Sequence, residues 1–131
     1  MTTAFPPATF GPIGRADLLR YAQASGDMNP LHLDPAAARR AGFPDVIAHG
    51  MYSAGLVAAE LVRRHGDGAL LHYAVRFRSP VHLGDTLTLT CDASTARAGV
   101  VEVDLVLTRQ TGEIAMTANA GLRMLASGDR S

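Results

Sequence analysis

The sequence predicts an α+β domain in which helices come first and a run of antiparallel strands follows. Two observations indicate this class. Three helical segments lie before residue 66, and from residue 71 onward apolar residues alternate with polar ones in four successive runs. Helices followed by strands are typical of an antiparallel sheet with helix on one face, whereas a parallel sheet would need the two kinds of element to alternate.

The first two predicted helices are short and lie in the N-terminal third. Residues 15–24 place apolar side chains at helical spacing, and Asp17 lies in the first turn, where the helix dipole favours a carboxylate. Asp34 and Pro35 then supply a cap and a proline at the first helical position, and Gly42 follows the end. We therefore predict a helix of one or two turns after Asp34.

The third predicted helix, residues 50–64, is the longest. Its alanine and leucine content favours helix, and Gly66 is the stop signal. Over the first three turns nearly every side chain is apolar or small. A helix that is apolar on all sides must be buried on most of them, so we expect a sheet to wrap around this segment.

Alternation with period two predicts four strands, at residues 71–78, 86–94, 101–108 and 114–124. The N-terminal segment contains Pro6, Pro7 and Pro12, which allow at most an edge strand. The single cysteine, Cys91, lies on the apolar side of its run, and we predict that it is a core residue rather than a nucleophile.

The composition narrows the classes of protein to which the chain can belong. Its 131 residues are 47% hydrophobic, which fits one compact domain over residues 1–131. The formal net charge is zero and charges of both signs are interspersed, so we expect no nucleic-acid partner and no membrane partner. All 12 basic residues are arginine, which excludes lysine-dependent chemistry such as Schiff bases and the Walker phosphate loop.

The N-terminus lacks the basic start and the long apolar segment of a signal peptide. No run reaches the roughly 18 apolar residues of a membrane span. We therefore expect a cytoplasmic protein.

The stretch SGDMNPLHLD, residues 25–34, places Asp27 and His32 five residues apart. Asn29 and Pro30 between them force the chain out of regular helix, because the residue before a proline is pushed to extended geometry. A loop can direct a carboxylate and an imidazole at one water, whereas a helix would point them about 140° apart. Taken alone, the stretch could equally be a structural turn.

These residues and those after them resemble the MaoC-like dehydratases, a family that includes the (R)-specific enoyl-CoA hydratases. The resemblance rests on the string YAxxSGDxNPxHxD from Tyr21 to Asp34, on AHGM at residues 48–51, and on FRSPV and GD at residues 77–81 and 84–85. It covers roughly residues 10–125. It implies the hot-dog fold, a curved antiparallel sheet wrapped around one long helix. It also implies active sites at a two-fold interface, and hence a homodimer or a heterodimer with another hot-dog subunit.

The chemistry that the resemblance implies assigns roles to specific residues. Hydration of an enoyl thioester needs a base, an acid and a dipole that holds the developing enolate oxygen. Asp27 and His32 are the expected catalytic pair, and the sequence leaves open which of them takes the proton from water. Gly50 is the expected oxyanion donor, because first-turn N–H groups have no partner within the helix.

Other residues are expected to support the site. Asn29 is either a turn former or an orienting residue, Ser25 precedes the catalytic loop, and His49 caps or packs at the start of the helix. Ser53, one turn into the helix, is a candidate contact. Some relatives carry a hydroxyl residue two turns into this helix, where the present chain has Ala58, so this supporting group is missing.

The sequence therefore predicts reversible hydration of a trans-2-enoyl thioester to the (R)-3-hydroxyacyl thioester. The carrier, coenzyme A or acyl carrier protein, stays open, although Arg39, Arg40, Arg76 or Arg78 could meet its phosphates. We expect no cofactor and no metal, because Ala38 stands where a calcium loop needs a glutamate. The alternatives are a hot-dog thioesterase and a non-catalytic subunit of a heterodimeric dehydratase.

Overall fold

The computed structural model describes residues 2–123, which form five strands, three α-helices and one 3₁₀ turn. In chain order these are β1 (Thr2–Phe10), α1 (Arg15–Ser25), η1 (Pro30–His32), α2 (Pro35–Arg40), α3 (Gly50–His65), β2 (Leu70–Phe77), β3 (Leu87–Arg97), β4 (Val100–Arg109) and β5 (Ile114–Arg123). The predicted α+β class is confirmed, and each predicted helix and strand is present with ends that differ by a few residues. The end of the last predicted strand, residue 124, lies outside the described residues.

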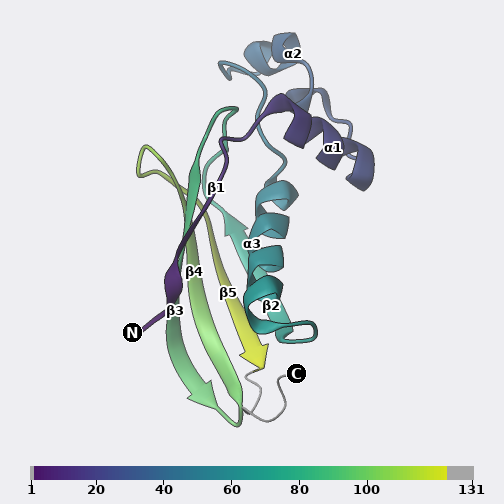
Figure 1. Cartoon of the computed structure of the whole chain (residues 1–131). Coiled ribbons are helices and arrows are strands. Elements are labelled where there is room, and N and C mark those ends of the chain that lie inside the picture. Colours follow the sequence, from purple (N-terminus) through teal and green to yellow (C-terminus); the bar gives the residue numbers. More distant parts are fainter. Residues whose placement is uncertain (1, 124–131) are drawn as a thin grey trace.

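One antiparallel sheet contains all five strands in the order β1-β3-β4-β5-β2. α3 lies along one face of this sheet, and α1 and α2 gather beyond the end at which α3 begins (Figure 1). β3, β4 and β5 are joined by short turns, whereas β2 pairs with β5 rather than with β3, its successor in the chain. β1 and β2 are therefore the two edges. The prolines of β1 coincide with a register shift between Phe5 and Ala8, as an edge strand tolerates.

The core lies between α3 and the facing side of the sheet. Alternate residues of β3, β4 and β5 are buried, and the fully buried leucines among them are Leu87, Leu89, Leu105, Leu107 and Leu122. They form one cluster with Val57 and Leu61 of α3. The hydroxyl of Tyr73 in β2 donates a hydrogen bond to the Ala54 carbonyl at 2.9 Å, and burial raises the pKa of Tyr73 to about 12. Cys91 is buried, as predicted.

α3 is covered on most sides, as expected, but one stripe of the helix is open in the single chain. On this stripe Met51 is 59% exposed, and Gly55 and Ala59 are exposed as well. Leu71, an apolar residue at the start of the alternating run of β2, is 41% exposed. A register shift against β5 lies between Leu70 and His72. Local periodicity predicts which residues are apolar, but pairing with the neighbouring strand decides which of them face the core.

A buried carboxylate fastens the loop between β2 and β3. Asp85 is 2% exposed and accepts hydrogen bonds from the His82 N–H, from Arg109 Nε at 2.6 Å and from the Gln110 side chain. In the same loop, the Val81 carbonyl accepts from the Ala48 N–H at 2.9 Å, two residues before α3 begins. Asp85 therefore helps to position the start of the central helix.

Within residues 2–123, no helix combines the length and the apolar character that crossing a membrane would require.

Candidate active site

The loop that follows α1 carries the predicted catalytic carboxylate. Gly26 has a φ of 81°, the left-handed conformation that glycine adopts without steric cost, and its N–H caps the helix at the Ala22 carbonyl. The chain therefore turns sharply before Asp27. The Ser25 hydroxyl accepts from the Asp27 N–H at 3.2 Å, and Asp27 Oδ1 accepts from the Asn29 N–H at 3.2 Å. Asp27 is exposed and keeps acceptor capacity for water.

The next turn places His32. Asn29 accepts from the Leu31 N–H at 3.0 Å and caps η1, so Asn29 acts here as a turn former. His32 Nδ1 lies 2.8 Å from the Ile47 carbonyl oxygen. Because a carbonyl can only accept, Nδ1 must carry the hydrogen, and Nε2 of the neutral ring holds a free lone pair.

His49, the residue before α3, packs between these two groups. It is 2% exposed, its Nε2 lies 3.0 Å from the Asp27 carbonyl oxygen, and its ring stacks on His32 with centroids 3.8 Å apart. Tyr21 packs against its other side at 4.8 Å. His49 occupies the N-cap position but makes no side-chain cap hydrogen bond. It therefore packs rather than caps, and it touches both members of the predicted pair.

Asp27, His32 and His49 form one cluster, in which one ligand-type atom from each residue lies within 4.8 Å of the other two. A water at hydrogen-bond distance from two groups spans up to about 5.6 Å, so a separation of 4.8 Å is short enough for one bridging water. The donor types also suit zinc, but His32 Nδ1 and His49 Nε2 each donate to a backbone carbonyl, at 2.8 Å and 3.0 Å. Only the other nitrogen of each ring is left as a possible ligand, and the absence of a metal stays a prediction from the sequence.

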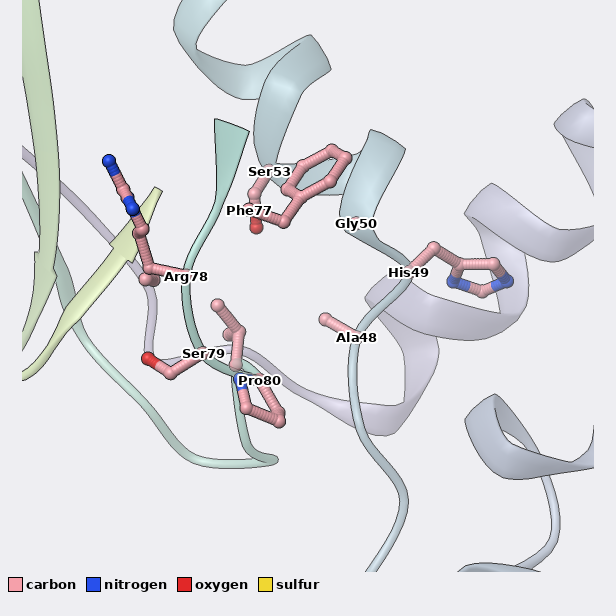
Figure 2. Close-up of a pocket in the computed structure, with 10 residues that line it drawn as sticks. Ala48, His49, Gly50, Ser53, Phe77, Arg78, Ser79 and Pro80 are labelled. Atoms are coloured by element: carbon pink, nitrogen blue, oxygen red, sulfur yellow. The ribbon is translucent and has the colours of Figure 1, made fainter. Parts of the chain in front are cut away.

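The start of α3 opens onto a cavity of about 270 Å³. Its lining includes Gly50, Ser53, Phe77 and Arg78, and Asp27 and His32 are not part of that lining. Figure 2 shows the Ser53 and Phe77 side chains on one side of the chain and the His49 ring directed to the other. His49 belongs both to the cluster and to the cavity lining, so His49 and Gly50 connect Asp27 and His32 with the cavity.

Phe77 is a site residue that sequence reasoning missed. A Cβ built on Gly50 would lie only 3.1 to 3.2 Å from three atoms of the Phe77 ring, so the ring covers the helix start at close range. Phe77 is nevertheless 48% exposed. Its place at an inward position of a strand predicts a core residue, and nothing in the local sequence indicates that β2 ends at the start of α3.

A curved antiparallel sheet around one central helix is the hot-dog fold. In this chain the carboxylate of Asp27 and the imidazole of His32 lie beside the start of that helix. The MaoC like domain family matches residues 3–113, and the chain belongs to this family.

Curated relatives and solved structures agree with this placement. An (R)-specific enoyl-CoA hydratase of Aeromonas caviae is 32% identical over 115 residues, which cover 85% of this chain and 86% of that protein. A 3-hydroxyacyl-thioester dehydratase X of Mycobacterium tuberculosis is 46% identical over 84 residues, which cover 64% of this chain but only 29% of that protein. The unliganded R-hydratase PhaJ1 of Pseudomonas aeruginosa superposes with a TM-score of 0.85 at 31% identity, covering 95% of this chain and 81% of that one.

A further structure shows the fold alone. It is a complex of Mycobacterium tuberculosis named ChsH1-ChsH2, which superposes with a TM-score of 0.85 at 21% identity over 95% of this chain and 98% of that one.

Proposed function

We propose that the protein catalyses reversible hydration of a trans-2-enoyl thioester to the (R)-3-hydroxyacyl thioester. One observation carries the proposal: a ligand-type atom of Asp27 and one of His32 lie within 4.8 Å of each other, next to His49 at the start of α3. The names of the relatives support the reaction class and the (R) configuration. We expect no cofactor beyond the thioester substrate, and a cytoplasmic location stays a prediction from the sequence.

His32 is the group that takes the proton from water. Its Nδ1–H is held by the Ile47 carbonyl, so the Nε2 lone pair is available as a base. Asp27 accepts the second hydrogen bond of the water and fixes its orientation. As the water oxygen adds to C3, its proton moves to Nε2 of His32, which then delivers a proton to C2.

Gly50 supplies the hydrogen-bond donor for the enolate oxygen. The N–H groups at the start of a helix have no acceptor within it and lie at the positive end of its dipole. The Gly50 N–H can therefore donate to the thioester oxygen, which gains negative charge as the enolate forms. The absence of a side chain at this position keeps the approach open, apart from the Phe77 ring.

We also propose that two hot-dog chains associate through the free edge of β2. β2 is an edge strand of eight residues, and edge strands present unpaired N–H and C=O groups. Leu71 and Phe77 of β2 and Met51 of α3 are all more than 40% exposed, which is unusual for such large apolar side chains. A second copy that pairs with β2 would cover apolar side chains of this edge and add a wall to the cavity next to Gly50.

The test of the catalytic pair is the turnover of crotonyl-CoA by Asp27→Asn and His32→Ala variants. We expect each change to lower kcat/KM by roughly 10² to 10⁴, because His32→Ala removes the base and Asp27→Asn removes the carboxylate that orients the water. Loss of the enoyl absorbance measures the reaction, and circular dichroism checks the fold. Activity within twofold of the parent in either variant would remove the assignment.

A thiol-reactive dye in the same assay separates hydration from thioester hydrolysis. Hydration leaves the thioester bond intact, so no free thiol is expected. Release of thiol at the rate of substrate loss would instead indicate a hot-dog thioesterase. An inactive parent chain that gains activity on mixing with another hot-dog subunit would indicate a non-catalytic partner.

A further inference from the structure

Ser53 carries a buried hydroxyl that no neighbouring group satisfies. The residue is 2% exposed, and its Oγ has no hydrogen-bond partner among residues 2–123. A buried hydroxyl without a partner is unfavourable by about 1 to 3 kcal/mol, so such groups are rare unless they have a function. Serine in a helix also tends to bond back to a carbonyl one turn earlier, and Ser53 does not.

The position of Ser53 directs this hydroxyl toward the start of α3. The Cα–Cβ bonds of a helix tilt toward its N-terminus, so a side chain covers the turn before its own Cα. For Ser53 that turn contains Gly50, which has no side chain of its own. Both residues line the cavity of about 270 Å³, and Ser53 lies beside Phe77 there (Figure 2).

Few polar side chains line the rest of this cavity. Five of the other lining residues are apolar: Ala48, Phe77, Pro80, Val81 and Ala115. The Ser79 hydroxyl already donates to the Ile114 carbonyl at 2.6 Å. His49 and Arg78 also line the cavity, but the His49 ring is directed away from Ser53 and Phe77, and Arg78 follows the end of β2 (Figure 2). On the α3 side, the first turn of the helix and the Ser53 hydroxyl are therefore the donors beside Phe77.

We propose that Ser53 Oγ–H is the second hydrogen-bond donor to the thioester oxygen, beside the Gly50 N–H. This inference rests on the proposed hydratase function and adds a residue to it. Two donors stabilise the enolate oxygen more than one, and in the apolar cavity each is worth more than in water. The binding of substrate supplies the partner that the Ser53 hydroxyl lacks in the free protein.

The first experiment compares Ser53→Ala with the parent in the crotonyl-CoA assay. We expect kcat/KM to fall by between about 10-fold, typical of a neutral hydrogen bond, and about 100-fold, typical of an oxyanion donor. The loss should lie mainly in kcat, because the charge on the oxygen develops in the transition state. The melting temperature should stay equal or rise, since alanine favours helix and removes an unsatisfied hydroxyl.

Ser94→Ala is the matched control. Ser94 is exposed on β3, and its hydroxyl donates to the Glu102 carbonyl at 3.1 Å, away from the cavity. We expect its kcat/KM to equal that of the parent. A Ser53→Ala enzyme with parental kcat/KM would overturn the inference, while the effect of Asp27→Asn would still stand for the proposed function.

The second experiment does not depend on turnover. In an Asp27→Asn background the substrate is expected to persist, so the infrared carbonyl stretch of bound crotonyl-CoA can be recorded. Two donors should lower this frequency relative to free substrate. Adding Ser53→Ala should raise the frequency part of the way back toward that of free substrate. An unchanged frequency in the double variant would show that Ser53 does not touch the thioester oxygen, whatever the fate of the catalytic pair.

Discussion

At the scale of single residues, the site depends on how two histidines differ. His32 donates from one ring nitrogen to the Ile47 carbonyl and leaves the other nitrogen free for the proposed role as base, whereas His49 is buried and forms the surface on which His32 stacks. His49 also bonds to the Asp27 carbonyl, so it fixes the backbone of the carboxylate and the ring of the base at once. The two histidines thus have the same chemistry but different roles, because their burial and partners differ.

Gly50 gives the sharpest residue-scale prediction. A Gly50→Ala change should lower kcat/KM by about 10-fold or more, because the new methyl group would collide with the Phe77 ring and displace groups at the helix start. The stability should change little, because the strain against the Phe77 ring opposes the preference of alanine for helix and Gly50 has no positive φ. Urea unfolding and the crotonyl-CoA assay on the same samples check both statements. Gly55→Ala, on an exposed and open stretch of α3, is the control. A Gly50→Ala enzyme with parental kcat/KM would contradict this prediction, because it would show that the Phe77 ring moves aside without disturbing the start of the helix.

At the scale of elements, the loop between β2 and β3 connects the sheet to the start of α3. Burial alone raises the pKa of Asp85, but hydrogen bonds from Arg109, Gln110 and the His82 N–H outweigh it, so the pKa lies below its usual range. The ionised carboxylate therefore stabilises the fold. Because the folded pKa is lower than the unfolded one, this contribution is complete above the unfolded value near 3.8 and is lost as the pH falls through the lowered folded value.

The corresponding prediction concerns Asp85→Asn. At pH 7 the change should lower the free energy of unfolding by about 1 to 3 kcal/mol, because the largely buried Arg109 guanidinium loses one of its two carboxylate partners and keeps only Glu113. The difference from the parent should shrink as the pH falls below about 3.8, because the unfolded parent then takes up a proton that the folded parent, with its lower pKa, binds only at still lower pH. Urea titrations from pH 3 to pH 7 measure this trend. Asp67→Asn, in the exposed turn after α3, should match the parent throughout. If the free energy of unfolding of Asp85→Asn differed from that of the parent by the same amount at every pH, the charge of Asp85 would not be what stabilises the fold.

At the scale of the whole molecule, the single chain leaves large apolar side chains exposed. Leu71, Phe77 and Met51 lie on β2 and α3, whereas Leu19, Met28 and Ile114 are exposed elsewhere. The buried side of α3 accounts for only part of the apolar surface of this helix. Association through β2 would explain why a helix that is apolar on nearly all sides is stable here.

Light scattering tests this association directly. The parent should have about twice the 13.8 kDa mass of one chain, and Leu71→Glu should shift the equilibrium toward the monomer, because it places a charge on the free edge of β2. Leu19→Glu, at an equally exposed leucine on α1, should leave the mass unchanged. A monomeric parent at micromolar concentration, or equal masses for both variants, would exclude β2 as the interface.

The sequence by itself determined the order of helices and strands, the core position of Cys91 and the resemblance to the MaoC-like dehydratases. These features depend on local periodicity, on turn residues such as Gly26 and Pro30, and on a run of residues close together in the chain. The suggested roles of Asp27, His32 and Gly50 came from the same run, and they stay proposals that the experiments above test.

Only the tertiary structure decided which groups meet. Stacking of His49 on His32, the Phe77 ring over Gly50 and the unsatisfied Ser53 hydroxyl all join residues from different elements or depend on the space around them. The exposure of Leu71 likewise depends on the register between β2 and β5. Such contacts depend on how the whole sheet pairs and wraps around α3, and the pattern within one segment contains no information about the distance to another.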